Sequence, residues 1–598
     1  MRFRQILLYS IALSAAAADV KLLPEHIRVD PFGAVVERDR GSGVEAARSI
    51  TLEAPRAAYV SCRIVVSLPE GGAYRLDVKS PLAADLFREW YHFLPASKKY
   101  VPDALVPAQT PHEARMPQPD NRIEKQTVQS YWLDIWVPAE ARPGRYQVAV
   151  AVESGGSASR AEVEVRVLDA VVPGDDAVVM DHNSYGTSWL AAQYPSLVQR
   201  LGSRFYLSDE FFGLIHAYHR ILYEHRGVYH QLGYGHGGKV GPEFAPRLEG
   251  WGKTKRVSDW SLYDRHYGPL LDGSAFASTR RGARPIPFVY LPVNPEWPAS
   301  YLWWGEPGYE REFVNVMKEV EAHFRQKGWT RTNFELFFNH KKRYKAFDWD
   351  GDETRFPGDM PYFAEYARLM RLAFASSSPV RWVFRADVSW QMERQFKELA
   401  GIINFWVCGG GMFGWYAENA AVLKQRGDIV WIYGGTPTAE EPASRMAVDA
   451  LRCWMLGVDG FVRWQTVLPG RDPWFNFGGG GETVVYPGDR FGVEGPLPSV
   501  RLKLQRNMLQ DLALLNSFQS RVPPATLRAG AAQRFNGTRV EDWRSPRPKL
   551  ADSDPLGWSN LSIGEAESKD PRFDQALDAA AWGRVRGYIL NLAKEVRP

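Results

Sequence analysis

The chain has few cysteines and no long runs of one physical character. Only three cysteines occur in 598 residues, Cys62, Cys408 and Cys453, and none of them stand in CxxC spacing. This excludes a disulfide scaffold and a cysteine-rich zinc site. After the first residues no apolar run is long enough for a membrane helix. The net charge of +4 is spread without a basic block, so we expect neither a membrane span nor nucleic-acid binding.

Aromatic residues are the abundant class instead. The chain has 22 Trp, 26 Tyr and 30 Phe, within a composition that is 45% hydrophobic and 24% charged. This balance is typical of globular chains, and the length indicates two to four domains. Aromatic faces stack on sugar rings, but they also fill cores. Composition alone therefore only suggests a carbohydrate partner.

The first 18 residues have the pattern of a secretory signal peptide. Arg2 and Arg4 precede an apolar run, Ile6–Leu13, and Ala15–Ala18 supply small residues for cleavage before Asp19. The alternative is an N-terminal anchor helix, but the run is too short to span a bilayer. We expect an exported mature protein, secreted or periplasmic.

Residues 19–172 are predicted to form an all-β sandwich domain. Short alternating runs recur there, broken by Gly, Pro and Asp, which is typical of that fold. The runs are Tyr59–Val66, Tyr74–Val78, Tyr131–Val137, Tyr146–Val152 and Ala161–Val167. We expect Val137–Tyr146 to be a hairpin connection and Val171–Gly174 to be a linker.

Residues 175–524 are predicted to form an α/β domain, a (β/α)8 TIM-like barrel, because strand-like runs alternate with helical ones. The strands are Ala177–Asp181, Val228–Tyr234, Pro287–Pro292, Phe334–Asn339, Trp382–Asp387, Ile402–Val407, Ile429–Tyr433 and Gly460–Trp464. The helices are 209–225, 309–327, 360–376, 390–400, 415–426, 439–456 and 499–519. Thr438 with Glu441 predicts a capping box, and Ser499 an N-cap.

Two long segments, 235–284 and 465–498, are predicted to be loops on the barrel. The first is rich in glycine and poorly helical, and the second includes Gly478–Gly481. Loops that follow the strands build the active site of such a barrel. Residues 525–598 are predicted to be a polar C-terminal extension with one helix near 572–595.

Two adjacent carboxylates stand out on the loop after the fourth barrel strand. Asp352 and Glu353 end the acidic segment Phe347–Glu353. Glycoside hydrolysis needs an acid that protonates the leaving oxygen and a second group that stabilises the oxocarbenium-like centre. A calcium loop is an alternative, although its sharp-turn position holds Glu353 rather than glycine. A solvated loop in which Asp359 caps the next helix is another.

Other polar and aromatic residues lie at or beyond strand ends. Asp387 could orient a substrate hydroxyl or simply pair with Arg385. One or two of the aromatic residues could form a sugar platform, while the others fill the core. His182, His225, His230 and His236 lack metal-binding spacing. The further candidate substrate-binding residues are Asn339, Lys341, Trp390, Tyr433, Trp464, Glu296 and Trp297.

Three stretches resemble glycoside hydrolase family 123 and its uncharacterised relatives. The first is Phe334–Lys341 followed by Trp349–Glu353, which is similar to the family's strand, loop and Asp-Glu pair. The second is Gly457–Trp464. The third is Val485–Gly488 followed by Gly495–Leu502. Tyr131–Val152 also resembles the β-sandwich that precedes the barrel, and the likeness covers roughly residues 130–520.

The resemblance implies a retaining β-N-acetylhexosaminidase, typically one that cleaves β-N-acetylgalactosaminides without a metal or organic cofactor. The substrate's 2-acetamido oxygen would attack the anomeric carbon and form an oxazoline or oxazolinium. Asp352 would orient and stabilise the acetamido group, and Glu353 would act as general acid and then as base. The family pair is usually followed by proline, whereas Thr354 stands here.

Two other functions fit the same sequence features. One is a glycosidase of different specificity with a covalent carboxylate nucleophile, in which Asp387 or Glu296 belongs to the catalytic pair. The other is a non-catalytic carbohydrate-binding protein on the same fold. That protein should have an open groove, with Glu353 turned away or engaged in a salt bridge.

Overall fold

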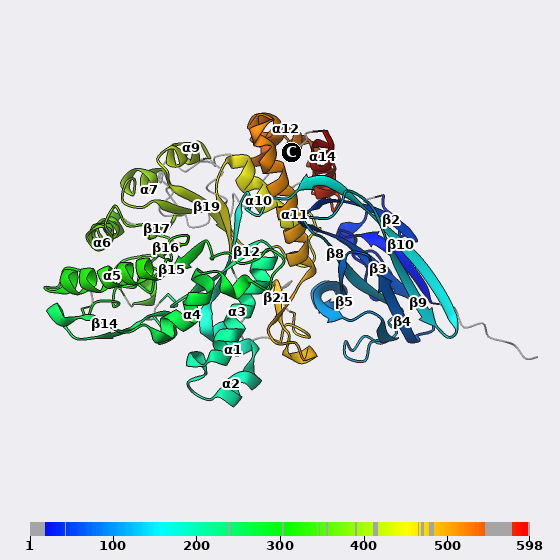
Figure 1. Cartoon of the computed structure of the whole chain (residues 1–598), viewed down its shortest axis with the longest axis horizontal. Coiled ribbons are helices and arrows are strands. Elements are labelled where there is room, and N and C mark those ends of the chain that lie inside the picture. The colour runs from blue at the N-terminus through cyan, green and yellow to red at the C-terminus, as the bar shows by residue number, and fades with distance from the viewer. Residues whose placement is uncertain are drawn as a thin grey trace, which may run out of the picture. The chain divides into compact units, whose positions relative to one another are not determined.

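The computed structural model describes residues 18–41, 43–236, 240–301, 304–345, 347–354, 357–388, 392–410, 417–464, 466–467, 472–477, 483–544 and 577–595 (Figure 1). Residues 1–17 of the expected signal peptide, Trp390, Gly478–Gly481 and much of the C-terminal extension lie outside these residues. The chain divides into two compact units. They are Met1–Tyr91 with Tyr100–Asp169, and His92–Lys99 with Ala170–Pro598.

The N-terminal strands form two five-stranded sheets, which confirms the predicted β-sandwich. One sheet has the order β1 (Asp19–Pro24), β3 (Ala58–Ser67), β8 (Val128–Val137), β5 (Ala83–Leu94), β6 (Lys99–Ala108). The other has the order β2 (Ser49–Arg56), β10 (Ser157–Val171), β9 (Gly144–Ser154), β4 (Gly72–Lys79), β7 (His112–Met116). Five of these strands, β1, β2, β5, β6 and β7, were not predicted.

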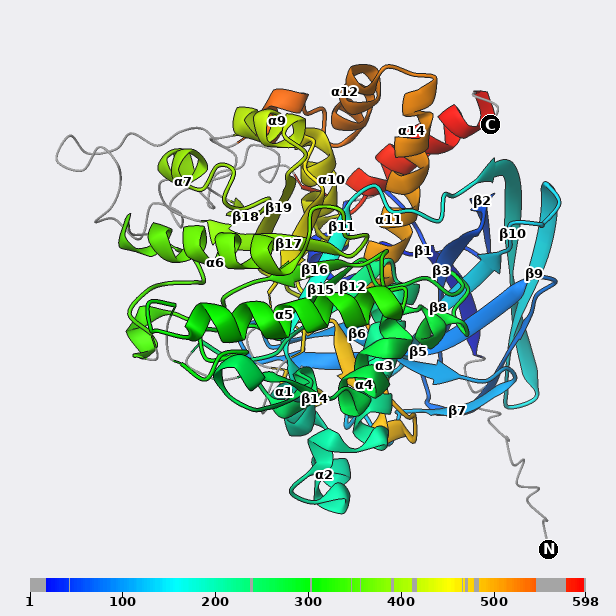
Figure 2. The same ribbon diagram turned by 60° about the vertical axis from the view of Figure 1, so that its left-hand side comes forward.

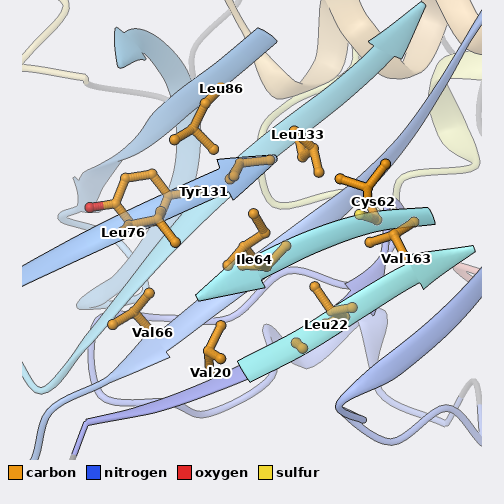
Figure 3. Packing of buried hydrophobic residues seen from close by; sticks show 14 of the residues in the cluster. Val20, Leu22, Cys62, Ile64, Val66, Leu76, Leu86, Tyr131, Leu133 and Val163 are labelled. Atoms are coloured by element: carbon orange, nitrogen blue, oxygen red, sulfur yellow. The ribbon is translucent and has the colours of Figure 1, made fainter. Parts of the chain in front are cut away.

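The sandwich core is built from alternate residues of facing strands. Cys62, Ile64 and Val66 point from β3 toward Leu76 and Val163, which belong to the other sheet (Figure 3). Successive strand residues face opposite sides, so each second residue enters the same apolar layer. This alternation made the strands visible in the sequence.

The predicted hairpin at Val137–Tyr146 is wrong. β8, which ends at Val137, and β9, which begins at Gly144, belong to different sheets. Both edges of β8 are occupied, by β3 and β5, so β9 pairs with β10 in a hairpin where Ser154 lies opposite Ser157. The segment therefore crosses between the sheets.

The second unit contains a nearly closed eight-stranded parallel barrel, as predicted. Its order is β12 (Gly227–Leu232), β11 (Val179–Tyr185), β20 (Gly460–Arg463), β19 (Ile429–Gly434), β18 (Phe405–Gly409), β17 (Arg381–Val388), β16 (Asn333–Leu336), β15 (Phe288–Tyr290). The end strands β12 and β15 lie next to each other. All eight strands coincide with predicted ones, with shifted ends.

Helices follow most of these strands. The helices of this unit, in the described residues, are α1 (Gly186–Gln193), α2 (Pro195–Leu201), α3 (Asp209–Glu224), α4 (Ser261–Leu271), α5 (Tyr309–Gln326), α6 (Met360–Ala373), α7 (Met392–Glu398), α9 (Ala417–Gln425), α10 (Arg445–Leu456), α11 (Val500–Ser517), α12 (Pro524–Arg534) and α14 (Ala581–Glu595). Figures 1 and 2 show α5 and α6 side by side along β15, β16 and β17. None of the described helices combines the length and apolar character that crossing a membrane requires.

One of the two predicted helix caps is present in the structure, and the other is not. Ser499 caps α11 by accepting a hydrogen bond from the Leu502 backbone N–H at 3.0 Å, as predicted. The helix expected from residue 439 begins only at Arg445. The Glu441 carboxylate does accept from the Thr438 N–H, at 2.8 Å, but this bond closes a local turn ahead of the helix.

The two expected loops contain structure of their own. Residues 235–284 include α4 and the antiparallel hairpin of β13 (Arg247–Glu249) and β14 (Arg256–Asp259). Residues 465–498 include a second hairpin, β21 (Val485–Pro487) with β22 (Pro496–Pro498). These strands have only three or four residues, too short to show a periodic pattern.

Candidate active site

A pocket of about 370 Å³ lies among the residues at and beyond the carboxyl ends of the barrel strands. Seven predicted site residues line it, namely Asn339, Lys341, Asp352, Glu353, Asp387, Tyr433 and Trp464. The other lining residues are Asn183, Leu232, His236, Phe337, Arg343, Arg385, Gly434, Gly435 and Val462. Glu296 and Trp297 are not among the lining residues, and Trp390 lies outside the described chain.

The pocket floor follows the two-residue period of the strands. Phe337, Asn339 and Lys341 continue the line of β16, and Arg385 and Asp387 come from β17. Inward-facing side chains of a barrel strand recur at every second position. This is how residues close in the sequence reach the pocket together, while their immediate neighbours pack outside it.

Backbone hydrogen bonds fix the loop that carries the acidic pair. The N–H groups of Gly351 and Asp352 donate to the His340 carbonyl at 3.0 and 3.1 Å. A Cβ at Gly351 would lie 2.5 Å from the Phe338 Cβ. Since a contact under 3.0 Å requires a shift, only glycine lets the loop approach the strand this closely.

Asp359 does not cap α6, contrary to one of the sequence interpretations. Its carboxylate instead accepts from the Asp350 N–H at 3.2 Å and from the Thr354 hydroxyl at 3.1 Å. Thr354 is fully buried, and its backbone carbonyl accepts from the Gln395 side chain. The carboxylate of Asp350 accepts from the Lys342 N–H at 2.7 Å. The acidic loop therefore uses these side chains to hold its own shape.

Lys341 joins the two carboxylates of the pair. Its Nζ forms an ion pair with Glu353 Oε2 and lies 3.3 Å from Asp352 Oδ2. Tyr433 donates a 2.7 Å hydrogen bond to the other oxygen of Glu353. Glu353 has φ of +50°, a left-handed conformation that is uncommon outside glycine. With this turn, two consecutive side chains line the same pocket.

The environment of Asp352 favours its ionised form. Burial raises the pKa of Asp352, but the hydrogen bond from His236 and the charge of Lys341 outweigh it, so that the pKa lies below its ordinary value. His236 Nε2 is 3.0 Å from Asp352 Oδ2. Burial lowers the pKa of Lys341, but Asp352 and Glu353 together raise it above its ordinary value. An ammonium group next to two carboxylates is the expected resting state.

Asp387 is held by Arg385 in a two-point contact. Arg385 Nε and Nη2 donate to the two carboxylate oxygens at 2.7 and 3.1 Å. Burial raises the pKa of Asp387 to about 6 although Arg385 opposes the rise, and the charges of Asp352 and Glu353 add to it. The pairing with Arg385 foreseen from the sequence is present, and Asp387 still lines the pocket.

A buried chain of charges continues below the pocket. His230 lies between Asp181, to which its Nδ1 is hydrogen-bonded, and Glu335, whose Oε1 is 3.1 Å from its Nε2. Arg385 Nη1 is 3.5 Å from Glu335 Oε2. All four residues are at most 2% exposed. Sequence reasoning missed His230 and Glu335 because it searched histidines for metal spacing rather than for inward positions on the strands.

Further aromatic rings pack against Trp464 and His236, two of the residues that line the pocket. The Tyr185 ring is perpendicular to the Trp464 ring at 5.3 Å, and Trp189 packs on Trp464 at 6.1 Å. The His236 ring stacks on Tyr344 at 5.2 Å. The sequence analysis gave His236 no role, because its spacing to other histidines does not suit a metal. Its contact with Asp352 shows that it belongs to the site.

Comparison with known proteins agrees with this architecture. Residues 57–154 match the family model described as the glycoside hydrolase 123 N-terminal domain. A solved family 123 glycoside hydrolase from Clostridium perfringens, analysed for glycolipid glycan hydrolysis, is similar over 97% of this chain and 99% of that chain, at 12% identity and a TM-score of 0.63. This chain has the fold of a family 123 glycoside hydrolase. The resemblance expected from the sequence is confirmed.

Other solved structures are similar at a lower level. A β-glucuronidase from Parabacteroides merdae is 8% identical over 76% of this chain and 50% of that chain, with a TM-score of 0.27. β-Glucuronidase 3 from Bacteroides uniformis is 13% identical over 77% and 51%, with a TM-score of 0.25. No curated protein matches the sequence.

Proposed function

We propose that this family 123-like protein is an exported glycoside hydrolase that cleaves β-linked 2-acetamido sugars, with β-N-acetylgalactosaminides as the preferred class. The observation that carries the proposal is the convergence of Asp352 and Glu353 on one pocket around Lys341. The pocket volume of about 370 Å³ suits a monosaccharide unit and its acetamido group.

The proposed reaction retains the anomeric configuration through two steps. In the first, the substrate's acetamido oxygen bonds to the anomeric carbon while the glycosidic C–O bond breaks, and Glu353 gives its proton to the leaving oxygen. In the second, Glu353 takes a proton from water, whose oxygen bonds to the anomeric carbon as the oxazoline opens. Asp352, kept ionised by His236 and Lys341, binds the amide N–H and balances its developing positive charge.

Aromatic walls support assistance by the acetamido group. Such a mechanism needs room beside the acidic pair and side chains that position the acetamido methyl group. Phe337, Tyr433 and Trp464 line the pocket together with the pair. Tyr433 also holds Glu353 through its hydroxyl, so the acid and the sugar platform are connected.

One feature favours the second candidate function, carbohydrate binding without turnover. The ion pair between Glu353 and Lys341 is the arrangement expected of a protein that kept the fold and lost the acid. In the proposed enzyme, substrate entry must separate this pair so that Glu353 can carry a proton. Turnover, rather than binding, therefore distinguishes the two functions.

The test compares aryl β-N-acetylgalactosaminide, β-N-acetylglucosaminide and β-galactoside as substrates of the mature protein. We expect turnover of acetamido sugars only, inhibition by the matching sugar thiazoline, and a loss of about 10²–10⁴-fold in Asp352→Asn and Glu353→Gln. Asp348→Asn is the matched control, since Asp348 is an exposed carboxylate of the same loop. Turnover unaffected by the two pocket variants would refute the site. Sugar binding without turnover would favour the non-catalytic function.

The proposal of export rests on the pattern of residues 1–18. Expression of the full chain in a bacterial host with a Sec pathway should yield a mature protein whose N-terminus is Asp19. Mass spectrometry of the periplasmic and cytoplasmic fractions checks this. A cell-associated protein that retains Met1 would contradict it.

A further inference from the structure

An exposed tryptophan lies on the β13–β14 hairpin and is not among the residues that line the pocket. Trp251 is 65% exposed, more than any other large apolar side chain in the described chain. It occupies the turn between β13 and β14, in the segment after β12, and β14 lies beside α5 (Figures 1 and 2). Burying an indole ring is energetically favourable, so an exposed one has two explanations. Either the ring binds a ligand, or it lies on a loosely held loop.

The turn is not loose. The Trp251 N–H donates to the Thr254 hydroxyl at 3.2 Å, and the Thr254 N–H donates back to the Trp251 carbonyl at 3.1 Å. Gly250 has φ of +75°, and a Cβ there would lie 2.1 Å from the Thr254 carbonyl oxygen. The backbone under the indole ring is therefore fixed by hydrogen bonds and by a glycine that no other residue can replace without strain.

A buried carboxylate places a second aromatic ring beside the first. Glu312 of α5 is fully buried, accepts from the Gly252 N–H with one oxygen, and accepts from the Ser300 N–H at 2.7 Å with the other. Gly252 follows Trp251, and Ser300 precedes Tyr301. The Trp251 and Tyr301 rings are consequently 6.1 Å apart at an angle of 34°. Two loops far apart in sequence thus present one preorganised aromatic surface.

A positively charged cleft of about 720 Å³ adjoins this surface through the same turn. Its charged lining residues are Glu249, Lys253, Lys255, Arg256, Lys318 and Glu319, an excess of two positive charges. Glu249 pairs with Arg256, and Glu319 accepts from the Val257 N–H at 2.7 Å. Lys253 and Lys318 have no ion-pair partner in the described part of the chain, so two ammonium groups are open to a ligand.

We propose that Trp251, Tyr301, Lys253 and Lys318 form a binding site for an anionic glycan, separate from the catalytic pocket. A pyranose ring stacks on Trp251 with Tyr301 at its edge, and Lys253 and Lys318 bind its carboxylate or sulfate group. Aromatic rings recognise the apolar face of a sugar, and ammonium groups recognise the anionic substituent. The site shares no residue with the pocket, and it does not depend on the proposed reaction.

The test is calorimetric titration of the mature full-length protein with three sugars that lack acetamido groups. Tetragalacturonate carries carboxylates, dextran sulfate carries sulfates, and maltotetraose is neutral. We expect one or both anionic sugars to bind. Their affinity should fall as salt rises from about 50 to about 500 mM, because salt screens the attraction between the exposed ammonium groups and the anionic substituents. Trp251→Ala, and the double variant Lys253→Gln with Lys318→Gln, should each weaken binding by about tenfold or more.

The control is the double variant Lys79→Gln with Lys125→Gln, which removes two exposed lysines from the other unit. Thermal melting verifies that each variant is folded, and Glu312→Gln should weaken binding without removing any ligand contact. Binding of maltotetraose equal to that of the anionic sugars would overturn the anionic class. No binding of either anionic sugar, or equal loss in the control, would overturn the site.

Discussion

His230 lies as a cation between two buried carboxylates, so its replacement should change how the stability of the barrel unit depends on pH. Burial lowers the pKa of His230, but Asp181 and Glu335 outweigh this effect and raise it from 6.5 to about 9. The imidazolium is also sandwiched against the Tyr290 ring, with ring centroids 3.8 Å apart. The folded state therefore binds a proton that the unfolded chain releases at lower pH.

The size of the effect follows from this difference. Raising the pKa of His230 from 6.5 to about 9 corresponds to about 3 kcal/mol of stability. Since the pKa is raised on folding, this contribution is fully present below pH 6.5 and is lost as the pH rises through about 9. For a unit of roughly 430 residues with an unfolding entropy near 2.1 cal/mol/K per residue, the melting temperature should fall by about 3 °C.

Scanning calorimetry of the full chain between pH 6.5 and 9.5 measures this fall. At pH 6.5 the free energy of unfolding of His230→Gln should be about 3–5 kcal/mol below that of the wild type, because two buried carboxylates lose their cation. The variant should lack the decline between pH 6.5 and 9.5. His182→Gln is the matched control, since burial lowers the pKa of His182 to about 3 and the ring stays neutral throughout. A wild-type melting temperature that is flat with pH, or a decline that His230→Gln retains, would refute the reasoning.

Three further predictions concern the pocket, its loop and the sandwich. Lys341→Met removes the charge 3.3 Å from Asp352 and should raise the pKa of Asp352 by about 1–3 units, moving the acid limb of kcat/KM to higher pH. An unchanged limb would show that the charge does not act on the catalytic group. Gly351→Ala brings a Cβ to 2.5 Å from the Phe338 Cβ and should destabilise by about 1–3 kcal/mol, measured by melting temperature alongside turnover. A melting temperature and a turnover equal to those of the wild type would mean that the loop can move away from Phe338 and accommodate the added methyl group. Ile64→Ala empties a fully buried position and should reduce the free energy of unfolding by about 2–5 kcal/mol in denaturant titrations, whereas a loss below 1 kcal/mol would contradict the packing.

Local patterns explain why the barrel could be predicted while some connections could not. Most of the barrel strands carry a short run of buried apolar residues, and the long helices were recognised from a spacing of apolar residues, so both can be detected within ten to twenty residues of sequence. The pairing of β9 with β10 instead of β8 depends on which strand edges are free, and that is a property of the assembled sheets. The hairpin at Val137–Tyr146 was therefore mispredicted although its flanking strands were found.

The acidic pair was predicted from the sequence in part, and its surroundings became known only from the structure. Its adjacency, the glycine before it and its place after the fourth strand are all in the sequence. The sequence also suggested that Asp359 caps α6, because a carboxylate before a helix usually does. The folded loop uses that carboxylate for the Asp350 N–H and the Thr354 hydroxyl instead. The sequence does not show that the folded loop brings these two donors within hydrogen-bond distance of the Asp359 carboxylate.

By itself, the sequence determined the order of the barrel strands and their long helices, the sandwich and barrel classes, the exclusion of a disulfide scaffold, and the line of inward residues after β16. Only the tertiary structure decided what surrounds the acidic pair. His236 reaches Asp352 across 116 residues of chain, and Tyr433 reaches Glu353 across 80. These four residues lie on or after three different barrel strands, which come together only when the barrel closes. Periodicity is a local property of the backbone, whereas electrostatic environment depends on which distant groups share a few ångströms of space.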